Sequence, residues 1–269
     1  MRMKLKLLLT AATIVGVTSA AQAQEEEAVY SVNVVGFQKK ELPDASQFDM
    51  YAAPFYTPGN TLIEIFGTNS LYGNNSAPLA DRLRLWDPNQ QIYINIGVAG
   101  NGRFYSQTAD GNWVSPLDDV SEMPLFPYEG LWIASSSQAP SDRTMTFAGD
   151  VVMDEDILYP FHPGFHLIAY PFSSSIPLQE MAFEESGAAK NNSAPLADRI
   201  RVWDSDSQSY VNYGLAGNGT WYLQDADGNW VSPLVESTHV IQPGDSFFYF
   251  SQGSYTWEEE NPYLLSVQE

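Results

Sequence analysis

Apolar and polar residues alternate with a period of two along much of the chain. In residues 82–86, two leucines alternate with Arg82, Arg84 and Trp86, and in residues 92–96 three isoleucines alternate with Tyr93 and Asn95. Such alternation is typical of β-strands that bury one face. Because the turn-forming residues 87–90 separate the two segments, the pattern predicts a hairpin with its leucines and isoleucines on the buried face.

Further segments follow the same pattern. Residues 103–114 predict a second hairpin, whose Asp-Gly turn at residues 110–111 supplies a positive φ. Other strands are expected at residues 30–37, 48–55, 129–135 and 144–150, and at their counterparts later in the chain. The helical pattern is confined to short stretches at Thr61–Phe66 and Pro177–Phe183. The sequence therefore predicts an all-β fold, an antiparallel sandwich or barrel.

The chain also repeats itself. Residues 74–117 align without a gap to residues 191–234, at an offset of 117, with 31 identities in 44 positions. This offset predicts two pseudo-symmetric tandem copies with one short helix each, spanning residues 30–146 and 147–263. No Gly/Ser-rich or Pro-rich linker separates the copies, so we expect them to pack closely.

The first 23 residues have the features of a signal peptide. A basic start that contains Arg2, Lys4 and Lys6 precedes an apolar run that ends at about Val17, and small residues at 21 and 23 follow. The run is shorter than the ~20 residues that a membrane span needs. We expect cleavage after Ala23, a secreted, periplasmic or cell-surface location, and no membrane insertion of the mature protein.

Composition and charge exclude several classes of partner and chemistry. The chain has 33 acidic and 12 basic residues and a formal net charge of −21. Cleavage would change this charge to −24, because it removes three basic residues and no acidic one. Nucleic acid and anionic lipid are therefore disfavoured partners. The absence of cysteine excludes disulfides, thiolate metal sites and a cysteine nucleophile.

Several polar and aromatic residues occur at the same position in both copies. Aromatic rings beside Arg and Asn side chains are typical of a sugar site, although the same face could instead pack against the other copy. The candidate ligand residues on the Arg-x-Arg-x-Trp strand and its neighbour are Arg201, Trp203, Tyr210 and Asn212. Those around the Asp-Gly hairpins are Tyr105, Trp113, Tyr222 and Trp230.

Two short acidic segments of the second copy resemble the start of a calcium loop. Oxygen ligands alternate in residues 225–229 and again in residues 204–206. The candidate Ca²⁺ ligands are Asp204, Asp206, Asp225, Asp227 and Asn229. An Asp-Gly hairpin turn explains the same residues without a metal, and no other cofactor is expected.

Constellations typical of catalysis are poor. The three histidines, at 162, 166 and 239, all lie in the second copy, and none has a histidine as its counterpart in the first copy. They also lack a metal-ligand spacing. No nucleophile elbow or phosphate-binding loop occurs, and no carboxylate pair is singled out among 33 candidates. The sequence therefore favours a protein that is not an enzyme.

Three segments carry a resemblance to a known group. Residues 30–37, 197–204 and 241–250 resemble secreted β-rich proteins common in Verrucomicrobia and their relatives. Those proteins begin with a Val-Gly-Tyr/Phe strand and repeat a Trp-centred strand followed by a Pro-Gly-x-x-Phe-Phe strand. The resemblance implies an extracellular or cell-envelope setting and no particular activity. The first copy departs from the pattern at residues 127–132, where Tyr-Glu precedes the glycine.

These observations favour a secreted, non-enzymatic protein with a structural, assembly or surface-interaction role. We expect the N-terminal strand to lie at an exposed edge, where a neighbouring copy of the chain could add a strand. The first alternative is a glycan-binding module with a polysaccharide as its partner. The second alternative is a hydrolase that uses a carboxylate site.

Overall fold

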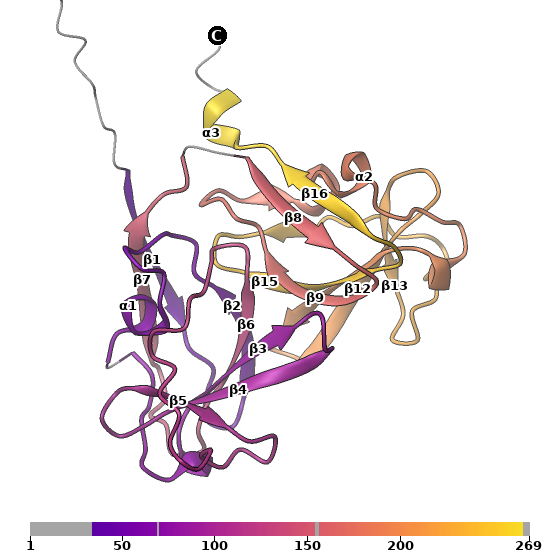
Figure 1. The fold of residues 1–269 in the computed structure, drawn as a ribbon. Helices are drawn as coiled ribbons and strands as arrows, with labels where there is room; N and C mark the ends of the chain where they lie inside the picture. Colours follow the sequence, from indigo (N-terminus) through magenta and orange to yellow (C-terminus); the bar gives the residue numbers. More distant parts are fainter. Residues whose placement is uncertain (1–33, 69, 154–155, 266–269) are drawn as a thin grey trace, which may run out of the picture. The chain divides into compact units, whose positions relative to one another are not determined.

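The structure is a computed structural model that describes residues 34–68, 70–153 and 156–265. The predicted signal peptide, residues 1–23, lies outside the described residues, as does the beginning of the strand predicted at 30–37. The described residues consist mainly of antiparallel β-strands with a few short helices (Figure 1). The predicted all-β fold is confirmed.

The first sheet has five strands in the order β2-β6-β3-β4-β5. Its strands in chain order are β2 (Phe48–Ala52), β3 (Arg82–Asp87), β4 (Ile92–Val98), β5 (Phe104–Gln107) and β6 (Gly130–Ala134). All neighbouring pairs are antiparallel, and β3 and β4 form the hairpin predicted from the alternation.

The second sheet has the order β9-β15-β11-β12-β13, which is the order of the first sheet with each strand replaced by its counterpart. Its strands are β9 (Gly164–Ala169), β11 (Arg199–Asp204), β12 (Ser209–Leu215), β13 (Trp221–Gln224) and β15 (Ser246–Ser251). Neither sheet closes into a barrel, because its two edge strands do not pair with each other.

Three two-stranded ribbons accompany the sheets. Strand β1 (Val35–Glu41) pairs with β7 (Thr144–Asp150), β8 (Ile157–Phe161) pairs with β16 (Tyr255–Glu259), and β10 (Ile176–Pro177) pairs with β14 (Val240–Ile241). Strand β7 runs through residue 146, at which the sequence places the boundary between the copies. The chain therefore leaves the first ribbon only after Asp150.

The helices are short. The predicted stretch at Thr61–Phe66 forms α1 (Leu62–Phe66), and Glu64 accepts a hydrogen bond from the Thr61 backbone N–H at 3.3 Å. The stretch predicted at 177–183 splits into a 3₁₀ turn, η2 (Leu178–Glu180), and the one-turn helix α2 (Phe183–Ser186). The remaining short helices are η1 (Ala77–Leu79), η3 (Ala194–Leu196) and α3 (Pro262–Leu265).

Each sheet buries one face in its own hydrophobic core. Leu83 and Leu85 lie in the first core, and Ile200 lies in the second core beside the partly buried Val202, as the alternation predicts. The isoleucines of β4 differ from the prediction. Ile96 is buried, but Ile92 and Ile94 are exposed. The reason is that β5 pairs with β4 only from Asn95 onward, so the tip of the hairpin extends beyond the core.

Candidate functional site

One row of polar side chains crosses each sheet on the face opposite its core. In the first sheet the row contains Arg84, Asn95 and Gln107, and in the second sheet it contains Arg201, Asn212 and Gln224. We call these two faces the polar faces. Alternate residues of a strand point to the same side of a sheet. The polar faces therefore carry the arginine and asparagine residues that the sequence analysis singled out, among them Arg201 and Asn212.

Two tryptophans of the polar faces connect one sheet to the other. The Trp86 Nε1–H group donates to the Phe165 carbonyl at 2.7 Å, and the Trp203 Nε1–H group donates to the Phe48 carbonyl at 3.0 Å. Trp203 is the counterpart of Trp86, and Phe165 is the counterpart of Phe48. The two contacts are therefore reciprocal, as in an isologous interface.

Gln91 and Gln208 strengthen the same reciprocal contact, and sequence reasoning missed them. Gln91 accepts from the Phe165 N–H at 2.9 Å and donates to its carbonyl at 3.0 Å. Gln208 makes the same two bonds to Phe48, at 3.1 and 3.0 Å. A signal was present, because glutamine is retained at this position although the preceding three turn residues differ between the copies.

A third hydrophobic cluster lies where the polar faces meet. Its buried members are Met50, Trp132, Leu167 and Phe248. Trp203 and Tyr210, two of the predicted ligand residues, pack against this cluster with ring centroids 4.9 and 6.1 Å from that of Trp132. The partly buried rings of Trp203 and Tyr210 thus contribute to the contact between the sheets.

The arginines of the polar faces, at positions 82, 84, 199 and 201, form no ion pair with any described residue. Instead, the Arg199 guanidinium lies 4.6 Å from the Phe250 ring centroid and that of Arg201 lies 5.0 Å from the Phe165 centroid. Burial, together with the nearby charge of Arg201, lowers the pKa of Arg199. Positive charge therefore remains unbalanced on these faces of an acidic protein.

A small cleft opens between the two polar faces. Its volume is ≈ 200 Å³, which is below the range of about 300–1,000 Å³ that is typical of ligand pockets. The residues that line it are Trp86, Tyr93, Phe165, Arg201, Tyr210 and Phe248. Two of these, Arg201 and Tyr210, were predicted as ligand residues. Phe165 and Phe248 were missed, although the phenylalanine at 165 also occurs at the equivalent position 48.

The predicted residues around the Asp-Gly hairpins do not line this cleft. The Trp113 Nε1–H group donates to the Asn75 carbonyl at 2.9 Å, and the ring covers Gly97, where a Cβ atom would approach it to 2.6 Å. Trp230 makes the equivalent bond to Asn192 at 2.8 Å and covers Gly214. A glycine is required at these two strand positions because the indole occupies the side-chain space.

The tyrosines of the hairpin region stand beside these tryptophans. The ring centroids of Tyr105 and Trp113 are 6.1 Å apart, and those of Tyr222 and Trp230 are 6.4 Å apart, in edge-on contact. All four side chains are partly buried. They form two equivalent aromatic pairs, one on each sheet.

The candidate calcium ligands form turns. Asp204 accepts from the backbone N–H of Asp206 at 3.0 Å, and Asp225 accepts from those of Asp227 and Asn229 at 3.0 and 2.8 Å. Hydrogen bonds from Ser207 lower the pKa of Asp204, and bonds from Asn229 lower that of Asp225. Among the residues that the structure describes, no three His or carboxylate side chains are arranged to hold a metal ion.

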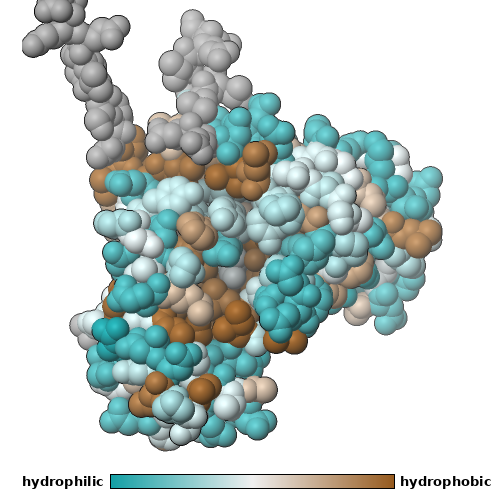
Figure 2. Space-filling model, in the orientation of Figure 1, coloured by the Kyte–Doolittle hydropathy of each residue, from teal (hydrophilic) through white to brown (hydrophobic). Residues whose placement is uncertain are grey.

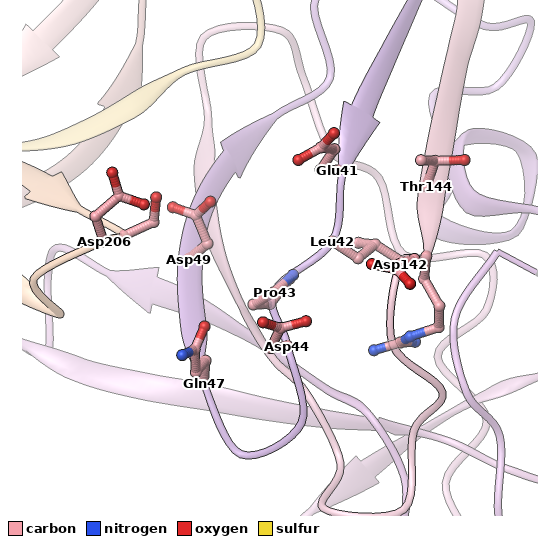
Figure 3. A pocket seen from close by; sticks show the side chains of 11 residues that line it. Glu41, Leu42, Pro43, Asp44, Gln47, Asp49, Asp142, Thr144 and Asp206 are labelled. Carbon is pink, nitrogen blue, oxygen red and sulfur yellow. The ribbon is translucent and has the colours of Figure 1, made fainter.

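An acidic pocket of ≈ 300 Å³ lies between the first ribbon, β2 and the turn after β11 (Figure 3). Its carboxylates are Glu41, Asp44, Asp49, Asp142 and Asp206. Burial raises the pKa of Asp49, although the Met50 N–H donates to its carboxylate at 2.7 Å. Asp206 lines this pocket, whereas the other four calcium candidates do not.

A second acidic cavity, of ≈ 620 Å³, surrounds the buried Glu259 at the end of β16. The Trp257 Nε1–H group and the Ala182 backbone N–H both donate to Glu259 Oε2, at 2.9 and 3.0 Å. These bonds connect β16 to the start of α2. Burial nevertheless raises the pKa of Glu259 to about 7, and the negative charges of Glu185 and Glu260 add to this shift.

We expect Glu259 to make the stability of the protein pH-dependent. Its folded-state pKa lies above the ordinary value of 4.5, so the free energy of unfolding should fall as pH rises from about 4.5 to 7 and then level off. Glu259→Gln should remove this fall and raise the free energy of unfolding by about 1–3 kcal/mol above pH 7. Urea titrations between pH 4 and 8 measure the effect.

The exposed neighbour Glu258 provides the matched control for that measurement. Glu258→Gln removes the same charge from the same strand without relieving a buried carboxylate. Its pH profile should follow that of the unmodified protein. Equal profiles for Glu259→Gln and Glu258→Gln would contradict the assignment to the buried group.

Strand β1 has an open edge. Its register with β7 and the bond from Leu42 N–H to the Arg143 carbonyl place the even-numbered residues of β1 in the ladder. The backbone groups of Val35, Phe37 and Lys39 therefore point away from β7, and no described strand pairs with them. The side chains of Val35 and Phe37 are 68% and 81% exposed.

Several other strand edges are covered. Beside β16, the Ser186 hydroxyl accepts from the Glu258 N–H at 3.0 Å. The edge of β8 contains Pro160, which has no backbone N–H group to donate to an added strand. The Ser106 N–H at the edge of the first sheet donates to the Asp118 carbonyl at 3.0 Å. On the outer edge of β1 the Tyr51 hydroxyl donates to the Glu41 carbonyl at 2.7 Å, but no proline interrupts the edge and the backbone groups of Val35, Phe37 and Lys39 have no described strand as a partner.

No described helix combines the length and the apolar character needed to cross a bilayer. Comparisons of the chain with known protein families, with curated proteins and with solved structures find no match. The proposals for its function therefore depend on the geometry of the two polar faces, the cleft and the open edge of β1.

Proposed function

We propose that the protein is a secreted, non-enzymatic protein of the cell surface or envelope that assembles with further copies of itself through β1. The observation that carries this proposal is the open edge of β1 with Phe37 81% exposed. Unpaired backbone groups beside apolar side chains are a template for strand addition. Apolar surface gathers where β1 begins (Figure 2).

Side chains on the face of β1 opposite to Phe37 hold the strand in place for pairing. Gln38 Nε2 donates to the Pro243 carbonyl at 2.5 Å, and Lys40 forms an ion pair with Asp245 at 2.6 Å. Gly36 lies against the Phe55 ring so closely that a Cβ atom would approach it to 2.1 Å. An edge that is already ordered loses less conformational entropy when a second strand binds.

The occupant that best fits this edge is β1 of a second copy, in an antiparallel arrangement about a two-fold axis. Lys39 and Glu41 are exposed on the same face of β1 as Phe37. An antiparallel pair brings Lys39 of each copy near Glu41 of the other, which is favourable between cross-strand neighbours. Elsewhere the large excess of acidic over basic residues makes two copies repel each other.

The test is a concentration series of the mature chain measured by light scattering after size-exclusion chromatography. The unmodified protein should change from monomer to dimer as its concentration rises. Phe37→Glu should weaken dimerisation about tenfold or more, because it places a charge beside the new strand pair.

Leu158→Glu is the matched control. Leu158 is 61% exposed on β8, the strand whose edge contains proline, so this variant adds the same charge at another exposed apolar position. It should dimerise like the unmodified protein. A protein that stays monomeric at every concentration, or equal weakening by both variants, would disprove assembly through β1.

A further inference from the structure

The cleft between the polar faces combines apolar walls with one unbalanced positive charge. Five of its six lining residues are aromatic, and the sixth is Arg201. Ligand sites typically pair such walls with a few polar groups that fix the orientation of the ligand. The volume of ≈ 200 Å³ corresponds to about seven water molecules at ~30 Å³ each, which suits one sugar ring rather than an oligomer.

The charge on Arg201 has no counter-ion in the described part of the chain. Its guanidinium lies over the Phe165 ring, and Arg199, the next residue on the same face, is equally unpaired. Two neighbouring arginines without an acidic partner are unusual in a protein with 33 acidic residues. A bound anion would reduce the repulsion between the two guanidinium groups. It would also accept two parallel hydrogen bonds from the guanidinium group of Arg201.

A polar acceptor lies beside the arginine. Asn212 is the cross-strand neighbour of Arg201, and its side-chain oxygen is buried without a hydrogen-bond partner among the described residues. The equivalent oxygen of Asn95 on the first sheet is also buried without a described partner, so this feature is common to both polar faces. What distinguishes the second polar face is that its arginine, Arg201, lines the cleft.

We propose that this cleft binds the carboxylate-bearing ring of an acidic sugar, a uronate. The carboxylate binds the Arg201 guanidinium, and the ring lies against the aromatic walls formed by Trp86, Tyr93 and Tyr210. The cleft contains no residue of β1, so sugar binding is independent of assembly through that strand.

Isothermal titration calorimetry with galacturonate and glucuronate tests the proposal on the full mature chain. Galactose and glucose serve as neutral probes, and acetate serves as a carboxylate without a ring. We expect saturable binding of at least one uronate, with the neutral sugars and acetate at least about tenfold weaker. Equal binding of the neutral sugar or of acetate would overturn the proposal, as would the absence of uronate binding.

Arg201→Gln should weaken uronate binding about tenfold or more, because it removes the charge but retains a polar side chain. Arg84→Gln is the matched control, since Arg84 is the counterpart of Arg201 on the first sheet but does not line the cleft. Arg84→Gln and the assembly variant Phe37→Glu should both bind as the unmodified protein does. Equal losses in Arg84→Gln and Arg201→Gln would contradict the site, provided that both variants melt normally.

Discussion

Trp132→Ala should lower the free energy of unfolding by about 3–5 kcal/mol, the range for deletion of a large buried aromatic side chain. Trp132 is 6% exposed and lies in the cluster where the two polar faces meet. Its ring centroid is 4.9 Å from that of Trp203, on the other sheet. The variant therefore measures how much the contact between the sheets stabilises the protein. Chemical denaturation followed by circular dichroism gives the value.

Leu158→Ala is the control for that experiment, because the leucine side chain at this position is 61% exposed and lies outside the proposed assembly edge. Its effect should remain within about 0.5 kcal/mol. A Trp203→Ala variant and the double variant complete a mutant cycle, in which the two indoles should show a coupling energy of about 0.5–3 kcal/mol. A loss below 1 kcal/mol for Trp132→Ala, or additive effects, would show that the cluster does not hold the sheets together.

The strands of the two sheets could be predicted because their signal is local. Leu83 and Leu85 alternate with polar residues, and this period of two indicates a strand whatever its partners are. The turns carry a similar local signal, as Gly111 at φ +79° shows. The pairing of β1 with β7 could not be predicted in this way, because the ladder joins Val35 to Asp150 across much of the chain.

The role of the polar faces could not be decided from the sequence for a related reason. An Arg-x-Arg-x-Trp strand is equally suited to an exposed sugar site and to a contact between sheets. What decides the role of Trp86 is the Phe165 carbonyl, which lies 79 residues away along the chain. In the structure, Trp86 and Trp203 connect the two sheets, and Trp86 also lines the cleft together with Arg201.

Position 81 and its counterpart 198 show how the same motif is stabilised in two ways. Asp81 and Asp198 occupy the same place in the repeated Ala-Asp-Arg segment, and both are fully buried. Asp81 forms an ion pair with Arg143 at 2.5 Å. Asp198 instead accepts a hydrogen bond from the Tyr249 hydroxyl at 2.6 Å. The repeated sequence is therefore identical at this position, but the side chain that pairs with the buried carboxylate differs between the two copies.

Arg143→Met should destabilise the protein by about 3–5 kcal/mol, because it leaves the buried Asp81 carboxylate without its charged partner. The backbone N–H groups of Tyr72 and Ser136 still donate to that carboxylate, each at 2.8 Å, but they carry no full charge. Tyr249→Phe is the matched change on the second sheet. It removes one hydrogen bond from Asp198 and should cost about 1–3 kcal/mol.

A second substitution separates loss of charge balance from loss of packing. Asp81→Asn in the Arg143→Met background replaces the unpaired charge with a neutral amide of similar shape, whose single oxygen can still accept from one of the two backbone N–H groups. The double variant should be more stable than Arg143→Met alone, because a neutral group is less costly to bury than an unpaired carboxylate. If the double variant is less stable instead, Arg143 contributes through its contacts with Pro140 and Ser135 rather than through its charge.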